Sequence, residues 1–180
     1  MNQKKVRGFE VIQDYKNKSI NLPQRSTYHA AGYDIEAAET CILPSYWKQI
    51  LHYYLLKFNI LKDDTVNDVN DILKPTLIPT GIKAYMKEDE YLQIVNRSSN
   101  PIKRRLMIPN GIGIIDQDYY NNENNEGHIF VQMLNFGLRD VKIEKGERIA
   151  QGIFSPFFKV DGDEGGVSQR TGGFGSSGHQ

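Results

Sequence analysis

Two segments place charged groups where they could bind phosphate or order water. Asp34 interrupts the apolar segment AAGYDIEAAE, and its carboxylate could face a cation or the water shell of one. In residues 96–99 (NRSS), Arg97 stands beside Ser98 and Ser99. This combination can clamp a phosphate, because the guanidinium binds oxyanions with two parallel hydrogen bonds and the hydroxyls donate to the remaining oxygens. Taken alone, each segment is more often an ordinary turn.

Three further segments combine glycines with single polar or aromatic side chains. Residues 110–119 (NGIGIIDQDY) carry Gly-x-Gly before an apolar strand, which excludes a dinucleotide-binding loop and leaves a hairpin that a flat ligand could approach closely. Residues 145–151 (KGERIAQ) are typical of a tight hairpin, with Gln151 as an unusual amide in an apolar run. Residues 170–178 (RTGGFGSSG) place Phe174 among glycines and hydroxyls, which suits an anion nest and stacking on a base.

The elements that must position these segments are short strands. Runs of strand-forming residues are bounded by Gly, Pro, Asn and Asp at spacings too short for crossover helices. The sequence therefore predicts antiparallel pairing and an all-β sandwich or barrel, and its length fits one domain. The predicted strands are residues 7–12, 33–38, 76–78, 82–86, 91–95, 112–115, 129–134, 148–154 and 157–160.

A helical insert over residues 45–75 departs from this pattern. Ser45 can cap a helix with one apolar stripe, made of Trp47, Ile50, Leu51, Tyr54, Leu55 and Phe58. A weaker second helix follows, capped by Asp64 or Thr65 and ended by Pro75, with Val66, Val69, Ile72 and Leu73 on its apolar side. Such a stripe must dock, and we expect it to pack within the assembly. Binding of a partner protein through this insert is the alternative.

Two other segments stand out by composition. Residues 119–127 (YYNNENNEG) are polar and rich in asparagine, which predicts a mobile loop between strands. Residues 161–180 carry seven glycines and three serines, which alone would predict a disordered tail. We expect a β domain over residues 1–160, including the insert, and a flexible Gly-rich arm over residues 161–180.

Charge and cysteine content narrow the function classes. Lys and Arg total 22 and Asp and Glu total 22, so no global field draws the chain to nucleic acid or an anionic membrane. The basic run Lys103, Arg104 and Arg105 lacks interleaved aromatics and is more typical of a solvated turn than of a nucleic-acid patch. The single Cys41 and the scattered histidines form neither an internal disulfide nor a zinc motif. Because the sequence also shows no signal-peptide pattern and no apolar run of ~20 residues, we expect a cytoplasmic protein.

Taken together and in this order, the five segments resemble the five motifs of the trimeric dUTP diphosphatases (dUTPases). The resemblance spans residues 31–178. It implies an all-β, jelly-roll-like β-clip fold and a homotrimer that hydrolyses dUTP to dUMP and pyrophosphate with Mg²⁺. It also implies that each active site is shared among three subunits and is closed by the C-terminal arm.

The resemblance implies roles for individual residues. Asp116 matches the catalytic aspartate that orients water for attack on the α-phosphorus. Tyr119 matches the tyrosine under the deoxyribose, which leaves no room for a 2′-hydroxyl. Asp34 and Gln151 match positions that hold waters on a Mg²⁺ carried by the triphosphate. The residues implied to bind substrate are Arg97, Ser98, Ser99, Asn110, Gly113, Ile115, Tyr119, Gln151, Arg170, Phe174, Gly175, Ser176 and Ser177.

The sequence departs from the family pattern in three of these motifs. Asn96 stands where Gly or Pro is usual, and YYNNENNEG replaces Tyr-Arg-Gly-Glu. Arg170 lies four residues before Phe174 instead of five, with Gln169 in the usual place. The helical insert replaces a short turn, and the resemblance says nothing about it. A related dCTP deaminase activity, and a regulatory protein that grips a partner through the insert, are the alternative functions.

Overall fold

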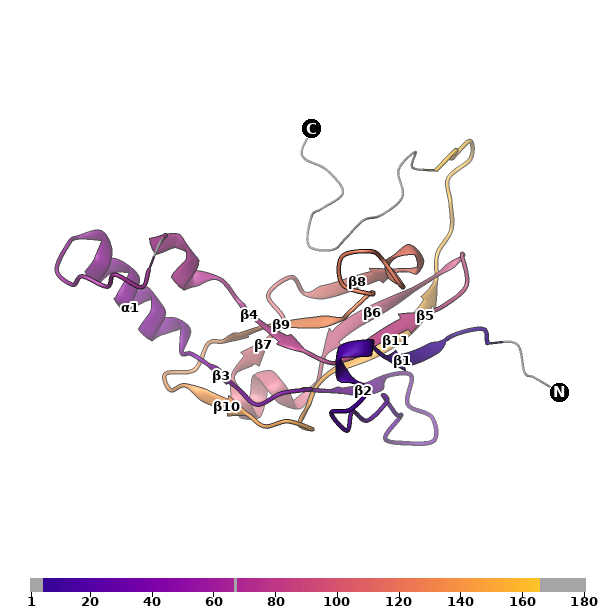
Figure 1. The fold of residues 1–180 in the computed structure, drawn as a ribbon, viewed down its shortest axis with the longest axis horizontal. Coiled ribbons are helices and arrows are strands. Elements are labelled where there is room, and N and C mark those ends of the chain that lie inside the picture. Colours follow the sequence, from indigo (N-terminus) through magenta and orange to yellow (C-terminus); the bar gives the residue numbers. More distant parts are fainter. Residues whose placement is uncertain (1–4, 67, 166–180) are drawn as a thin grey trace.

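The structure, a computed structural model, describes residues 5–66 and 68–165. Strands are its main regular elements (Figure 1). The strands are β1 (Gly8–Val11), β2 (Tyr33–Glu36), β3 (Cys41–Leu43), β4 (Thr76–Pro79), β5 (Ile82–Tyr85), β6 (Glu90–Asn96), β7 (Leu106–Met107), β8 (Ile112–Asp116), β9 (Phe130–Asn135), β10 (Val141–Ile143) and β11 (Arg148–Pro156). The helical elements are the 3₁₀ turns η1 (Gln13–Tyr15), η2 (Val69–Leu73) and η4 (Gln117–Tyr119), the α-helix α1 (Tyr46–Lys57) and the π-helical turn η3 (Asn100–Arg104).

The largest sheet has four strands in the order β2-β11-β6-β8. Smaller sheets pair β1 with β5, β3 with β10, and β4 and β7 with β9. Each of these strand pairs is antiparallel, so the predicted all-β class and antiparallel pairing are confirmed. Strands far apart in the sequence lie side by side, because β11 pairs with both β2 and β6.

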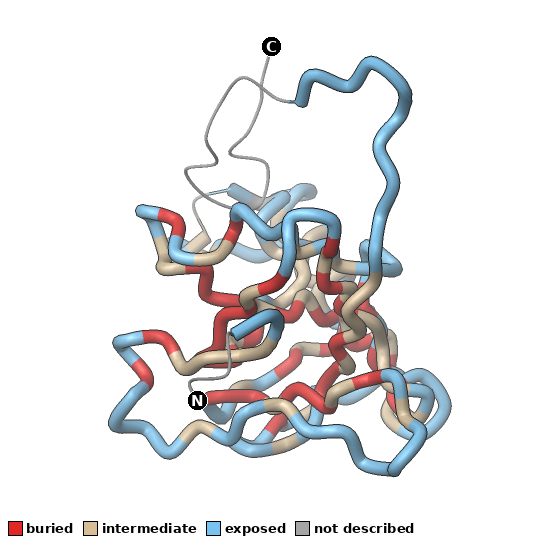
Figure 2. Tube along the Cα trace, turned by 90° about the vertical axis from the view of Figure 1, so that its right-hand side faces the viewer, coloured by how far each residue is buried: buried red, intermediate tan, exposed pale blue. Residues whose placement is uncertain are grey.

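The core forms because inward and outward side chains alternate along the longer strands. In β6, Leu92 and Ile94 are buried between more exposed neighbours, and Val131 and Met133 repeat this pattern in β9. All four join one apolar cluster, and each such burial contributes about 1.5–3 kcal/mol. Figure 2 shows the buried positions inside the strand body and the exposed positions on its loops.

The strand prediction fails at short elements and at one false strand. Because β3, β7 and β10 have only two or three residues, they are too short to show an alternating pattern. Residues 157–160, predicted as a strand, are not one, since the chain leaves the sheet after Pro156. Phe158 and Val160 are 95% and 79% exposed there, and the Phe157 N–H donates to the Asp89 carbonyl.

The helical insert forms where the sequence predicts it. The Ser45 hydroxyl accepts from the Lys48 N–H and caps α1. The second helix is the shorter turn η2, which Asp68 caps instead of Asp64 or Thr65. The Gln49 amide donates to the Ile72 carbonyl and ties the two helical elements together.

Within the single chain the insert's apolar stripe is not covered, so its expected packing within the assembly stays a prediction. No residue of α1 is buried, and Trp47 is 54% exposed. The reason is visible in Figure 1, where α1 projects from one end of the strand body and is not laid across it. The remaining exposed stripe residues are Leu51, Tyr54 and Phe58.

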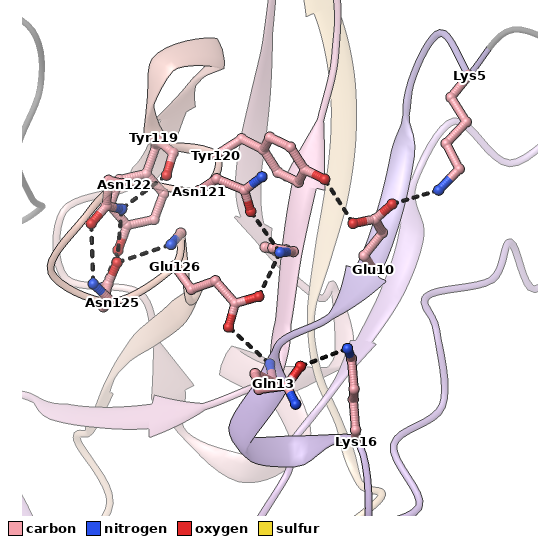
Figure 3. A network of polar contacts seen from close by, with 12 residues as sticks. Lys5, Glu10, Gln13, Lys16, Tyr119, Tyr120, Asn121, Asn122, Asn125 and Glu126 are labelled. Atoms are coloured by element: carbon pink, nitrogen blue, oxygen red, sulfur yellow. Dashed lines mark hydrogen bonds and ion pairs between the residues drawn. The ribbon is translucent and has the colours of Figure 1, made fainter.

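The asparagine-rich segment 119–127 is tied to the chain, whereas the sequence predicts a mobile loop. The Asn122 side-chain oxygen accepts from the N–H groups of Asn124 and Asn125, and the Asn125 oxygen accepts from the Gly127 N–H. The asparagine side chains thus accept hydrogen bonds from backbone N–H groups of the loop. A polar composition alone does not show that these bonds form. Figure 3 shows the resulting network, which continues to η1 and β1.

His128 follows this loop and is buried in a neutral, hydrogen-bonded position. Its Nε2 accepts from the Gly81 N–H at 3.0 Å, and its ring packs against Tyr15 and Phe130. Burial lowers the pKa of His128 from 6.5 to about 4. The unfolded chain therefore binds a proton between these pH values that the folded chain does not bind, so stability falls as the pH drops below 6.5.

We expect the free energy of unfolding to fall by about 1.5 kcal/mol between pH 6.5 and pH 5 because of His128. His128→Gln is the matched variant, since its amide oxygen can accept from Gly81 without titrating. Urea unfolding at fixed chain concentration should show this loss in the unmodified chain and a smaller loss in His128→Gln. Equal losses in both chains would contradict the assignment.

Candidate active site

Three of the five segments meet at the carboxylate of Asp34, which is 6% exposed. Its Oδ1 accepts from Arg97 Nε and Gln151 Nε2, each at 3.3 Å. Its Oδ2 accepts from Arg148 Nη1 at 3.1 Å. Two guanidiniums beside one carboxylate leave one positive charge in excess, which suits an anionic ligand.

Strand pairing brings this cluster together. In the β2–β11 pair, Gln151 lies directly opposite Asp34. A register shift between Arg148 and Ala150 marks a bulge, which lets Arg148 reach the same carboxylate. Gly32 makes room for the amide, because a Cβ at this position would lie 3.2 Å from Cβ and Cδ of Gln151.

Two asparagines brace the turn that carries Arg97. The Asn96 amide donates to the Leu106 carbonyl at 3.2 Å, and its oxygen accepts from Asn100 at 2.8 Å. Asn100 is buried and also donates to the Ile149 carbonyl at 2.8 Å. Asn96 stands where the family motif usually has Gly or Pro. Here it supports the turn that carries Arg97. Within this turn Ser98 is exposed and Ser99 is half-buried.

The third segment forms a hairpin that enters β8. Gly111 adopts φ +71°, a conformation that favours glycine, and the Ile112 N–H donates to the Asn110 carbonyl. A Cβ on Gly113 would lie 3.3 Å from Ile94 and 3.9 Å from the Asn110 amide nitrogen. The bare backbone beside this amide offers hydrogen-bonding groups to a flat ring. Ile115, expected to contact substrate, is a half-buried residue of β8 that packs against the core.

Asp116 and Tyr119 lie at the far end of β8. Asp116 is the exposed last residue of the strand and pairs with Tyr91 of β6. Tyr119 ends η4 and is 5% exposed. Its hydroxyl donates to the His128 carbonyl at 2.9 Å, so the ring is fixed just after the aspartate.

The chain does not bring Asp116 to the Asp34 cluster. Along β6, Tyr91 pairs with Asp116, whereas Asn96 lies at the opposite end beside Arg97. These ends are about 17 Å apart at the rise of a strand. The Arg97 side chain also turns toward β2, away from β8. Within one chain, Arg97 and Asp116 therefore lie at opposite ends of β6.

The fifth segment lies outside the described residues. It contains Arg170, Phe174, Gly175, Ser176 and Ser177, so the structure does not test their expected contacts. The boundary between the β domain and the arm near residue 160 likewise stays a prediction.

The Asp34 cluster fits a hydrated cation better than a directly ligated one. Among the described residues, no three His, Cys, Asp or Glu side chains are grouped so that they could hold a metal ion. The Asp34 carboxylate accepts three hydrogen bonds, and a carboxylate can accept about four. Asp34 and the adjacent Gln151 amide could therefore take waters of a Mg²⁺ that is carried by phosphate oxygens.

Sequence reasoning placed Arg148 only in a hairpin and missed its contact with Asp34. The sequence feature that could have indicated this contact is that Arg148 lies three positions before the unusual amide Gln151, on the same strand.

In the basic run of residues 103–105, Arg104 forms an ion pair with Glu147. The described part of the chain contains no helix of the length and apolar character needed to span a membrane.

Comparison with known proteins finds relatives over nearly the whole length of the chain. A family model for dUTPase matches residues 60–178. The deoxyuridine 5′-triphosphate nucleotidohydrolase of Lactococcus lactis subsp. lactis (strain IL1403) is 50% identical over 175 residues, covering 97% of this chain and 99% of that protein.

Solved structures agree with the fold. The crystal structure of a dUTPase from Streptococcus mutans is 42% identical, with a TM-score of 0.68 over 86% of this chain and 99% of that one. A mutant dUTPase from phage phi11 of S. aureus is 16% identical with a TM-score of 0.59, over 87% of this chain and 94% of that one, and shares the fold. That phage structure is described as revealing the coordination of a structural Mg(II) ion.

Proposed function

The chain belongs to the dUTPase family and hydrolyses dUTP to dUMP and pyrophosphate, and we propose that Asp116 positions the attacking water. The proposed reaction is in-line attack on the α-phosphorus. A carboxylate within hydrogen-bond reach can align water and accept its proton. The observation that carries the proposal is the meeting of three motif segments at Asp34, with Asp116 exposed on a separate strand end.

The remaining residues bind the two ends of the nucleotide. Arg97, Ser98 and Ser99 bind phosphate oxygens, and the excess positive charge around Asp34 supports this role. The hairpin from Asn110 through Gly113 receives the uracil, and Tyr119 lies under the deoxyribose. In the arm, Phe174 covers the uracil and the residues that reach the β- and γ-phosphates are Arg170, Gly175, Ser176 and Ser177.

Mg²⁺ is part of the proposal as a cofactor held through water. When bound to the triphosphate, the ion supplies charge that neutralises the phosphate oxygens. Asp34 and Gln151 would hold its waters, which the burial of Asp34 and the adjacent position of Gln151 support. Arg97 can then exchange its 3.3 Å bond with Asp34 for a phosphate oxygen.

We propose a homotrimer in which the sites are shared. The roughly 17 Å between the Arg97 end and the Asp116 end of β6 supports this, because a phosphate clamp from one chain must serve the aspartate of another. The partners are thus dUTP and further copies of the chain, without nucleic acid or membrane. A cytoplasmic location belongs to the same proposal and is supported by the single cysteine.

Release of pyrophosphate from dUTP, with Mg²⁺ and with EDTA, tests the proposed function. We expect rapid release with Mg²⁺ and strong suppression by EDTA. Incubation with dCTP should release no ammonia, which separates the hydrolase from the dCTP deaminase branch. Ammonia release from dCTP, or no pyrophosphate from dUTP, would contradict the proposal.

A second role concerns the insert, whose face of Trp47, Leu51, Tyr54 and Phe58 is exposed in the single chain. We propose that a neighbouring subunit covers this face, because a permanently exposed apolar stripe promotes aggregation. Binding of a different protein is the alternative. The face lies outside the five motif segments, so it can act without altering the chemistry.

Replacing residues 46–75 with a short glycine-containing turn tests this role. The change keeps the buried Ser45, whose hydroxyl donates to the Gly137 carbonyl. We expect dUTP hydrolysis to persist and the melting temperature to fall, since covered surface becomes exposed. Trp47 is the only tryptophan, so its fluorescence in the intact assembly should be that of a shielded indole. Water-exposed emission together with an unchanged melting temperature would favour a foreign partner.

A further inference from the structure

The hydroxyl of Tyr119 is held by two partners at once. It donates to the His128 carbonyl at 2.9 Å. It accepts from the Asn125 side-chain amide at 2.7 Å (Figure 3). The tyrosine is almost fully buried. Because both the donor and an acceptor function of the phenol are used, the ring cannot tilt without breaking a buried hydrogen bond.

Asn122 holds the other end of the same residue. Its amide donates to the Tyr119 carbonyl at 2.9 Å and to the Asn125 side-chain oxygen at 2.8 Å. Its own oxygen accepts from the N–H groups of Asn124 and Asn125, each at 3.1 Å. Asn122 is 7% exposed, so these bonds are shielded from water. The two asparagines therefore bond to each other and to both ends of Tyr119.

Glycine at position 127 lets the loop close around the tyrosine. Gly127 has φ +82°, and a Cβ there would lie 2.7 Å from the Tyr119 carbonyl oxygen, closer than real Cβ contacts allow. The Gly127 N–H donates to the Asn125 oxygen at 3.1 Å. The loop backbone thus approaches Tyr119 as closely as a chain can.

A second set of contacts fixes this loop to the strand body. The Lys83 ammonium of β5 donates to Glu126 and to Asn121, each at 2.6 Å. Glu126 also accepts from the Gln13 N–H at 2.8 Å. Lys83 is buried, so removing either partner would leave a poorly compensated charge. The loop cannot shift as a unit without disrupting this ion pair.

We propose that Asn122 and Asn125 are positioning residues that hold Tyr119 as a rigid wall of the sugar pocket and so set the discrimination between dUTP and UTP. The inference rests on the proposed function, in which Tyr119 lies under the deoxyribose. The Tyr119 ring can exclude the 2′-hydroxyl of UTP only if its position is fixed. Displacements of a positioned group near 1 Å change reaction rates strongly. Weakening the hydrogen bonds from Asn122 and Asn125 lets Tyr119 move, so that the 2′-hydroxyl of UTP fits. The groups that act on phosphate stay in place.

The test compares kcat/KM for dUTP and for UTP in Asn125→Ala. We expect the dUTP/UTP ratio to fall about three- to tenfold, the range of one hydrogen bond, chiefly through improved use of UTP. Tyr119→Phe removes the same bond from the other side, together with the bond to the His128 carbonyl, and should lower the ratio at least as much. The double variant should lower the ratio by less than the two single effects combined, because both changes remove the shared Asn125–Tyr119 bond.

Two further variants keep the test decisive. Asn124→Ala is the matched control, since Asn124 is exposed and contributes only its backbone N–H to these hydrogen bonds, so the ratio should not change. If Asn125→Ala fails to fold, Asn125→Asp retains an acceptor for the Gly127 N–H and lacks the donor to Tyr119. An unchanged ratio in folded Asn125→Asp, or additive effects in the double variant, would overturn the inference. Absence of dUTP hydrolysis in the unmodified protein would instead overturn the proposed function.

Discussion

Replacing Asp116 with asparagine is expected to slow dUTP hydrolysis by about 10²- to 10⁴-fold while leaving the fold and dUTP binding intact. The amide fills the same space but cannot accept the proton of the attacking water. Asp116 is exposed at the end of β8 and is not part of the apolar core cluster, so we expect the fold to tolerate its replacement. Single-turnover hydrolysis together with calorimetric binding of dUTP separates the chemical step from substrate affinity.

Asp64→Asn is a suitable control, because it removes an exposed carboxylate within the insert and away from the motif segments. We expect it to hydrolyse dUTP as the unmodified chain does. Near-normal turnover in Asp116→Asn would refute the proposed role of Asp116. A loss of dUTP binding equal to the loss of turnover would assign Asp116 to binding instead.

Removal of residues 172–180 is expected to lower activity by about 10²-fold or more and to preserve the assembled β domain. The deleted segment carries Phe174, Gly175, Ser176 and Ser177, which we assign to the uracil and the phosphates. An arm of this composition contributes little apolar area to a core. Steady-state hydrolysis and light scattering measure the two expected outcomes separately.

Deletion of His179 and Gln180 alone provides the matched control, since it shortens the chain and leaves the motif complete. That shorter deletion should retain full activity. Full activity after removal of residues 172–180 would show that the glycine-rich segment is only a tail. In the intact chain, a non-hydrolysable dUTP analogue should protect amides of this segment from hydrogen exchange.

The sequence was most informative where the chain repeats a regular pattern. The long strands β6, β9 and β11 and the capped helix α1 follow from apolar periodicity and from Ser45. Strands of two or three residues do not follow, because their pairing depends on distant partners. The exposure of α1 in the single chain could not be inferred either, since periodicity shows which residues share a face but not what covers that face.

The candidate active site could also be predicted only in part from the sequence. Motif order predicted that Asp34, Arg97 and Gln151 belong to one function, and the structure brings these three together. The contribution of Arg148 needed the β-bulge, which the sequence does not reveal. The asparagine loop was predicted to be mobile because composition cannot show that Asn122 and Asn125 bond to each other and to Tyr119.

Hydrolysis of dUTP in ¹⁸O-labelled water shows which phosphorus the water attacks, because the labelled oxygen stays bonded to that phosphorus. Attack on the α-phosphorus places one heavy oxygen in dUMP and none in pyrophosphate, as mass spectrometry of the two products can show. We expect labelled dUMP and unlabelled pyrophosphate at full conversion in the presence of Mg²⁺. Labelled pyrophosphate with unlabelled dUMP would mean attack on the β-phosphorus and would contradict the mechanism built around Asp116.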